Sequence, residues 1–298
     1  MNTPAKVAAF SLGLAAVFGA SVGVGAAVGP VDAEPAAEEH PDGGHAGETA
    51  HGGEAHPGAA EVPVGGLTVS GSGHTLDLLT DVLPAGTPTL AFRVLGPDGA
   101  PVTAFDVEHE EDLHLVAVRR DLTGYQHVHP EPSADGTWTV PLELTPGSWR
   151  VVADATPSAL GEDLALGADL AVAGDFTPQP LPPPAGTAGV DGYTVVLTGG
   201  LTAGTETELT LSVSRDGVPV TDLQPYLGAY GHLVVLREGD LGYVHVHPVE
   251  ETAGAAPAPG PHVVFATTAP GAGSYRLFLD FRHGDVVRIA AFTVEVPA

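Results

Sequence analysis

Short hydrophobic segments with the period of β-strands follow one another beyond residue 62. In them, apolar residues alternate with polar ones or run together without a break. They cover residues 89–95, 113–118, 138–144, 149–153, 207–213, 262–267, 275–281 and 286–296. Turn sequences such as Pro97-Asp98-Gly99 separate them, and the period of about 3.6 residues expected of an amphipathic helix is absent. The pattern predicts an all-β protein.

The strand pattern occurs twice, at a spacing of 118 residues over most of its length. For example, Ala85–Thr89 resembles Ala203–Thr207, and the proline-rich stretch 176–184 between the copies is typical of a semi-rigid linker. Each copy has about 110 residues, the usual size of an immunoglobulin-like β-sandwich, with a small barrel as the alternative. We therefore expect two tandem β-sandwich domains, at 62–174 and 190–298, which are connected by a linker at 175–189.

An uncharged apolar run from Val7 to Val28 follows Lys6, the only lysine of the protein. As a helix it is long enough to cross a bilayer, and it exceeds the apolar region of about 7–15 residues in a cleaved signal peptide. We therefore expect residues 1–29 to form a signal anchor, which places the protein in the cell membrane as a single-pass protein with its body outside. Cleavage near Ala33, which would release a secreted protein, is the alternative.

The next segment, 30–61, consists mainly of Ala, Gly, Glu, Pro and His, a composition that predicts disorder. It carries four histidines among acidic residues: His40, His45, His51 and His56. A histidine-rich flexible tract is typical of a weak collector of metal ions, whereas a spacer with incidental histidines is the simpler alternative.

Composition restricts the chemistry that the protein can perform. The formal net charge is −27, which repels phosphate backbones, so no nucleic-acid partner is expected. The same charge attracts cations, although an acidic surface also simply keeps a protein soluble. Cysteine is absent and Met1 is the only methionine. A metal site would therefore use imidazole, carboxylate and backbone groups, which suits Cu(II) or Zn(II) better than Cu(I).

A set of three histidines is present in both copies in one register. Each set has the spacing His-x12-His-x-His-Pro, and every member of the second lies 118 positions after its counterpart. The six residues are His114, His127, His129, His232, His245 and His247. Because imidazole is the commonest protein ligand of late first-row metals, the repeated set predicts two equivalent metal sites.

Strand geometry explains how each set would converge. Two histidines separated by one residue share a face of a strand. A hairpin turn at 120–124 would bring His114 opposite His127 and His129, and a turn at 238–242 would do the same for the second set. Asp154 and Asp280 follow equivalent arginines by four residues, and we expect them to pair with Arg150 and Arg276. Coordination of the ion, or a hydrogen bond to a histidine ring, is the alternative for these carboxylates.

Two other functions compete with metal binding. The histidines share faces with apolar residues, so the alternative is that they are hydrogen-bonded core groups of a structural or interaction module. A three-histidine zinc site with an open position would activate water, but no carboxylate within the repeated motif is an obvious general base. There is also no cysteine nucleophile. The sequence therefore indicates a protein that is not an enzyme.

The motif His-Leu-x-Val-x-Arg, followed by Tyr-x-His-Val-His-Pro and then Gly-Ser-(Trp/Tyr)-Arg-x3-Asp, resembles that of a group of exported, membrane-anchored β-domain proteins of actinobacterial type. Members of the group are often encoded near copper-exporting ATPases. The resemblance implies copper or heavy-metal handling, with metal-export machinery as a partner. Members often have Met just before the first histidine, where this chain has Leu113 and Gly231. That departure argues against a Cu(I) role.

Overall fold

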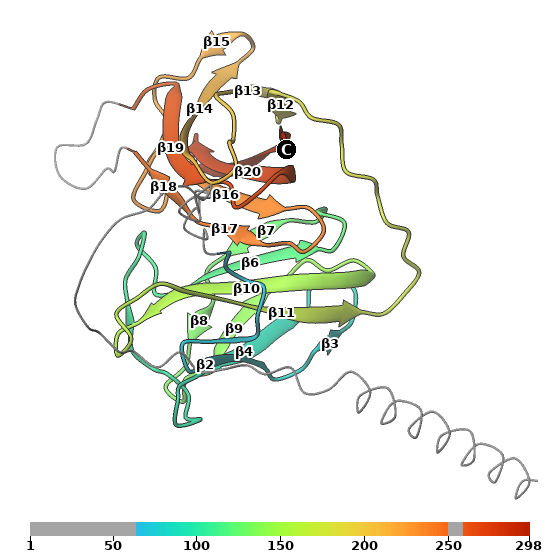
Figure 1. Cartoon of the computed structure of the whole chain (residues 1–298), viewed down its shortest axis with the longest axis vertical. Helices are drawn as coiled ribbons and strands as arrows, with labels where there is room; N and C mark the ends of the chain where they lie inside the picture. Colours follow the sequence, from blue (N-terminus) through green and yellow to red (C-terminus); the bar gives the residue numbers. More distant parts are fainter. Residues whose placement is uncertain (1–63, 250–258) are drawn as a thin grey trace, which may run out of the picture. The chain divides into compact units, whose positions relative to one another are not determined.

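The computed structural model describes residues 64–249 and 259–298, which contain strands and turns but no helix (Figure 1). The all-β prediction is therefore confirmed for these residues. Within them, no helical segment exists that would cross a membrane. The expected signal anchor at 1–29 and the histidine-rich segment at 30–61 lie outside the described residues, and both stay predictions.

The first half of the described chain forms two sheets. One has the order β1-β2-β4-β9-β8, and the other has the order β3-β11-β10-β6-β7 with β5 paired to β10. The strands are β1 (Ser70–Gly71), β2 (His74–Leu78), β3 (Val82–Leu83), β4 (Thr89–Leu95), β5 (Phe105–Asp106), β6 (His114–Arg119), β7 (Gln126–Val128), β8 (Glu131–Pro132), β9 (Trp138–Pro141), β10 (Gly147–Pro157) and β11 (Leu164–Val172).

The second half repeats this arrangement. Its sheets have the orders β12-β13-β14-β19-β18, with β15 paired to β14, and β17-β16-β20-β21. The strands are β12 (Thr187–Val190), β13 (Tyr193–Thr198), β14 (Glu206–Arg215), β15 (Val218–Pro219), β16 (His232–Arg237), β17 (Tyr243–Val244), β18 (Val246–Pro248), β19 (His262–Thr268), β20 (Gly273–His283) and β21 (Val286–Val296). The strand β12 begins three residues before the boundary placed from the sequence at 190.

Each half has its own hydrophobic core between its two sheets. In the first half, Phe92 and Trp138 from one sheet pack in the same core as Trp149 from the other. In the second, Phe265 from one sheet shares a core with Tyr275 from the other. Two sheets packed face to face around alternating inward side chains form an immunoglobulin-like β-sandwich, as the strand pattern predicts, rather than a barrel.

A third hydrophobic cluster joins the two halves, and we call it the joint. Its buried residues are Val116, Val118, Leu122, Tyr125 and Val152 from the first half and Val234, Leu236, Leu241, Tyr243 and Phe278 from the second. The strands β6 and β16 contribute to it because their apolar runs leave no polar face. One face of each strand meets its own core and the other meets the opposite half. The rings of Tyr125 and Phe278 stack with centroids 3.9 Å apart.

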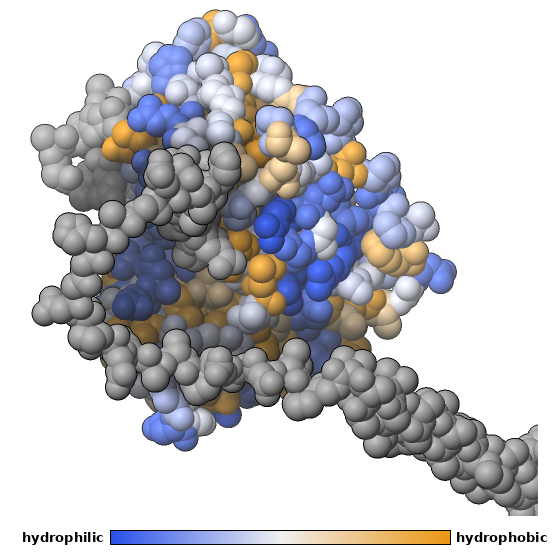
Figure 2. Space-filling view, viewed as in Figure 1, coloured by the Kyte–Doolittle hydropathy of each residue, from blue (hydrophilic) through white to orange (hydrophobic). Residues whose placement is uncertain are grey.

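Two connecting segments also link the halves. Gly65 exchanges backbone hydrogen bonds of 2.9 and 3.0 Å with Tyr243 of β17, and the next amide, of Gly66, donates to the carbonyl of Ala165 in β11. The linker between β11 and β12 is fixed as well, because the amide of Gln179 donates to Asp121. On the face seen in Figure 2, hydrophilic and hydrophobic side chains are interspersed.

Candidate metal centre

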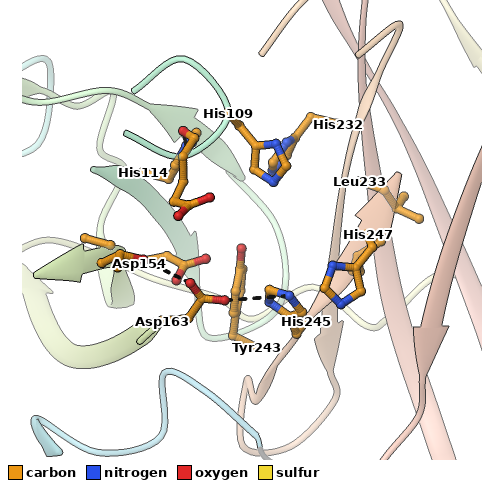
Figure 3. Close-up of a pocket in the computed structure, with 13 residues that line it drawn as sticks. His109, His114, Asp154, Asp163, His232, Leu233, Tyr243, His245 and His247 are labelled. Atoms are coloured by element: carbon orange, nitrogen blue, oxygen red, sulfur yellow. Dashed lines mark hydrogen bonds and ion pairs between the residues drawn. The ribbon is translucent and has the colours of Figure 1, made fainter. Parts of the chain in front are cut away.

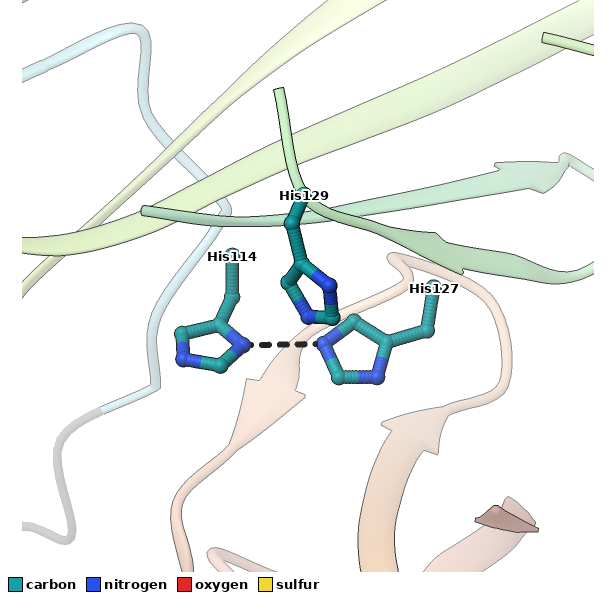
Figure 4. A group of neighbouring side chains, drawn as sticks. All are labelled: His114, His127 and His129. Carbon is teal, nitrogen blue, oxygen red and sulfur yellow. Dashed lines mark hydrogen bonds between the residues drawn. The ribbon is translucent and has the colours of Figure 1, made fainter. Parts of the chain in front are cut away.

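The first histidine triplet converges as its spacing predicts. Residue His114 begins β6, and the register that pairs Val116 with His127 continues beyond the end of β7 to place His129 opposite His114. Each of the three rings offers a nitrogen, and these nitrogens all lie within 4.8 Å of one another (Figure 4). The group is the only one of its kind among residues 64–249 and 259–298.

Hydrogen bonds connect two of these rings in a chain. His114 Nε2 lies 3.0 Å from the carbonyl oxygen of Glu108, and because a carbonyl only accepts, this nitrogen carries the proton. His114 Nδ1 lies 3.1 Å from His127 Nε2 and accepts a hydrogen bond from the N–H of that nitrogen. At the far end, His127 Nδ1 lies 2.9 Å from Asp280 Oδ2. One proton is therefore shared between His127 and Asp280 at the end of the chain.

The surroundings keep the rings neutral. Desolvation, followed by the neighbouring His127, lowers the pKa of His114 to about 3 and that of His129 to about 4. Desolvation, followed by the neighbouring His127 and His114, lowers the pKa of His232 well below its usual value. Burial raises the pKa of Asp280, against the opposing effect of its hydrogen bond with His127. At neutral pH the rings of His114, His129 and His232 hold no extra proton that a metal ion would have to displace.

The third ring, His129, has an unused nitrogen. Its Nε2 is buried and has no hydrogen-bond partner among the described residues. Its Nδ1 lies 3.7 Å from a carboxylate oxygen of Glu111, but with a pKa of about 4 the ring is uncharged at pH 7, so this contact is not an ion pair there. A buried nitrogen without a partner costs stability unless a ligand uses it.

The first histidine of the second set, His232, lies against the first triplet rather than in a site of its own. Its ring centroid is 4.6 Å from that of His127 and 5.7 Å from that of His114, in stacked orientations. The ring of His109 is 5.6 Å from His232. Five imidazoles, from both halves, thus gather at one place.

The expected second triplet is not assembled in the described part of the chain. Strand β17 ends at Val244, and the following strand, β18, pairs with β19 in the other sheet. The chain therefore leaves the sheet of His232 at His245, whereas in the first half β7 stays with β6 through Val128. Both His245 and His247 are exposed, and their ring centroids lie 4.2 Å apart.

The expected pairing of the two aspartates with arginines is wrong. Four residues along a strand separate two side chains by roughly 13 Å, which is out of reach. Arg150 pairs instead with Asp169, and Arg276 donates to Thr293. Across the joint, Asp280 interacts with His127, so the alternative of a hydrogen bond to a histidine ring holds for this carboxylate.

The counterpart of Asp280 in the first half, Asp154, makes the matching contact across the joint. It is hydrogen-bonded by Tyr243, just as Tyr125 donates to Asp280. Burial, as the largest effect, raises the pKa of Asp154. The two halves thus exchange Tyr–Asp contacts in a nearly symmetric way.

A cavity of about 200 Å³ lies beside the cluster (Figure 3). Its lining includes Glu108, His109, His114, Asp154, Asp163, His232, Tyr243, His245 and His247. Sequence reasoning assigned no role to His109 because it has no counterpart in the second copy. Nor did it find Asp163, which lies in a β10–β11 connection longer than the tight turn at the equivalent place in the second half. No signal in one sequence would have paired these residues with the repeated motif.

Comparisons with known proteins give a family but no activity. A model of the family described as "Domain of unknown function (DUF8832)" matches residues 68–159 and 188–298, together more than half of the chain. A search of curated proteins found no significant match.

Among solved structures, the adhesin FdeC of Escherichia coli shows 16% identity over 77% of this chain and 65% of its own, with a TM-score of 0.24. Fibronectin(III)-like modules of CbhA from Clostridium thermocellum show 11% identity over 75% of this chain and 94% of theirs, with a TM-score of 0.21. A Salmonella alpha-2-macroglobulin mutant shows 17% identity over 80% of this chain and 15% of its own, with a TM-score of 0.26. Scores this low support no inference about function.

Proposed function

This chain belongs to the DUF8832 family of domains of unknown function. We propose that it is an exported, non-catalytic β-protein. Its two halves would be joined around a histidine cluster that binds one divalent metal ion, Cu(II) or Zn(II). The body would lie outside the cell membrane, and the bound ion would be held for sequestration, tolerance or delivery to metal-export machinery.

The contact between His114 and His127 carries the proposal. Their facing nitrogens are 3.1 Å apart. In a tetrahedral site with bonds of about 2.05 Å, two ligand nitrogens lie about 3.3 Å apart. The separation of the two nitrogens is therefore within a few tenths of an ångström of that in a metal site, and the rings would have to turn so that both lone pairs face the ion. The buried, unpartnered Nε2 of His129 supplies a third nitrogen close by.

Asp280 supports the same arrangement, because it lies next to the second ring nitrogen of His127. If His127 binds an ion through Nε2, its Nδ1–H donates to Asp280, and the carboxylate stays ionised. A carboxylate that accepts from the second nitrogen of a ligating histidine fixes the ring and raises its basicity. The chemistry of three imidazoles without a thiolate or thioether favours Zn(II) or Cu(II).

Calorimetric titration of the full-length protein in detergent tests this function. The chain should carry Asn at His40, His45, His51 and His56, so that only the body contributes. We expect one site per chain for Zn(II) or Cu(II), abolished by His127→Asn and by His129→Asn but kept in His262→Asn, whose exposed ring contacts Ser212 instead. Absence of binding at micromolar metal would refute the proposal.

A purely structural role for the histidines is the second candidate. It is favoured by the hydrogen bonds of His114 and His127, whose ring nitrogens all have partners without a metal. In that case, His127→Gln would lower the melting temperature by the same amount with and without added metal. Metal binding predicts instead that metal stabilises the unmodified chain and not the variant.

A further inference from the structure

His245 and His247, which do not join His232 in a second triplet, lie near the carboxylate of Asp163 in the first half. His245 Nε2 lies 3.9 Å from Asp163 Oδ2, and the ring of His247 contacts that of His245. The side chains of His245 and Asp163 are 50% and 60% exposed, so solvent reaches both. Neither histidine ring makes a hydrogen bond to another described residue, so no such contact holds the rings in place. Figure 3 shows the pair beside Asp163 at one side of the cavity.

The cavity connects this group with the buried cluster. Its lining includes His245, His247 and Asp163 together with His114 and His232. Within the cluster, the side chain of His127 is only 1% exposed, so an ion from solvent cannot reach it directly. The cavity reaches His114, the hydrogen-bonded neighbour of His127, and so offers a path from the outer group to the cluster.

We propose that Asp163, His245 and His247 form an outer capture site, which binds a divalent transition-metal ion weakly and passes it through the cavity to the buried histidine cluster. The inference rests on the proposed function, because it needs the cluster as the final site. An imidazole pair with one carboxylate has suitable ligand chemistry for such an ion.

The charges along the route act in the same direction. Glu108 and Asp163 both line the cavity. A cavity lined by acidic groups in a protein of net charge −27 raises the local concentration of cations and speeds their association. Since the outer ligands stand apart from the cluster, their removal should change the rate of loading more than the final affinity.

Stopped-flow mixing of the metal-free full-length chain with Zn(II) tests the route. The chain carries the four tail substitutions to Asn, and a fluorescent zinc indicator reports free metal. For the double variant with His245→Asn and His247→Asn, we expect loading to slow about tenfold. Release into a chelator should slow by a similar factor, which leaves the dissociation constant within about twofold. The exposed His262→Asn serves as the matched control, with no change in either rate.

The outcomes separate this inference from the function beneath it. Loading at the unaltered rate in the double variant, with the cluster still binding zinc, would overturn the capture site alone. A weaker dissociation constant with unchanged loading would also overturn it, because the pair would then be equilibrium ligands of the bound ion. No zinc binding by the chain with an intact cluster would remove the proposed function and the capture site together.

Discussion

The rings of His114 and His129 are kept neutral by desolvation and by the neighbouring His127. An unfolded chain would bind protons on both rings below a pKa of about 6.5. The folded state does so only near pH 3 and pH 4 respectively. Between these limits the unfolded state holds more protons, so folding stability falls as the pH is lowered.

We therefore expect the free energy of unfolding of the metal-free protein to decline from pH 6.5 to pH 5, with a slope that grows as both groups titrate in the unfolded chain. Urea unfolding at pH 7, 6.5, 6, 5.5 and 5 measures it. A variant with His114→Asn and His129→Asn should show a shallower decline. If its curve runs parallel to that of the unmodified protein, these rings are not the origin. His262→Asn should keep the original slope.

A buried leucine with left-handed backbone occurs in each hairpin turn, three residues after Arg119 in the first turn and four residues after Arg237 in the second. Leu122 has φ 60° and Leu241 has φ 61°, and both side chains are buried in the joint. This conformation costs a non-glycine residue about 1–2 kcal/mol. The burial of the leucine side chain in the joint offsets that cost.

Substitution of Leu122 should invert the usual order of alanine and glycine. Leu122→Ala loses about 2–5 kcal/mol of packing and keeps the backbone cost. Leu122→Gly loses the same packing but relieves the backbone, so we expect it to be the more stable variant by up to about 1 kcal/mol. Chemical unfolding of both variants measures the difference. At Leu115, within β6, the normal order should hold, with alanine above glycine. If the alanine variant is more stable than the glycine variant at both positions, the backbone of Leu122 carries no such cost.

Single residues of the site were predictable only where they repeat. Strand alternation and a hairpin turn are local rules, so they sufficed to bring His114 together with His127 and His129. The partner of His127, Asp280, is 153 residues away in the sequence and belongs to the other half. A rule based on neighbours in sequence assigned it to Arg276, because nothing in the pattern shows which surfaces of the two halves meet.

At the scale of elements, two hairpins of similar sequence differ in where the second strand changes sheet. Strand β7 stays with β6 for three residues, while β17 stays with β16 for two. The difference moves His245 and His247 from the cluster to the cavity. Hydrophobic alternation is the same in both hairpins, so it predicts strands but not the residue at which a strand crosses over. The two-residue strands, such as β1 and β5, are also too short to show a period.

The strand β11 requires glycine where another segment crosses it. A Cβ atom on Gly167 would lie 1.9 Å from the carbonyl oxygen of Gly66, and backbone on both sides leaves no room to adjust. We expect Gly167→Ala to lower the free energy of unfolding by at least about 3 kcal/mol. Thermal unfolding compared with Gly200→Ala, where a Cβ meets nothing within 4 Å, measures this. A melting temperature unchanged from that of the control would show that the segment can move aside.

At the scale of the whole described body, the joint connects two halves that each have a core, and we expect it to make them unfold as one cooperative unit. Its ring stack between Tyr125 and Phe278 and its paired Tyr–Asp contacts hold surfaces of both halves together. The sequence predicted the two sandwiches from periodicity. It did not predict the joint, because an apolar run such as Leu115–Val118 has the same appearance whether its second face meets a ligand, a membrane or another half of the chain.

Loss of the joint should separate the unfolding of the halves. We expect the unmodified protein to unfold in a single calorimetric transition, and Phe278→Ala to cost about 3–5 kcal/mol and to give two transitions. Phe265→Ala, equally buried but inside the core of the second half, should destabilise that half without uncoupling it through the joint. A single, merely lowered transition for Phe278→Ala would mean that the linker and the segment at Gly65 suffice to couple the halves.

The hydrogen bonds between Gly65 and Tyr243 have a mechanical consequence. A pull that reaches the chain at residue 64 would act on this pair and on the hydrogen bond of Gly66 to β11. The load therefore reaches the joint, to which Tyr243 belongs, before it reaches the core of either half. It also acts on the strand that ends one residue before His245. Such a pull would thus act first at Tyr243, which lines the cavity.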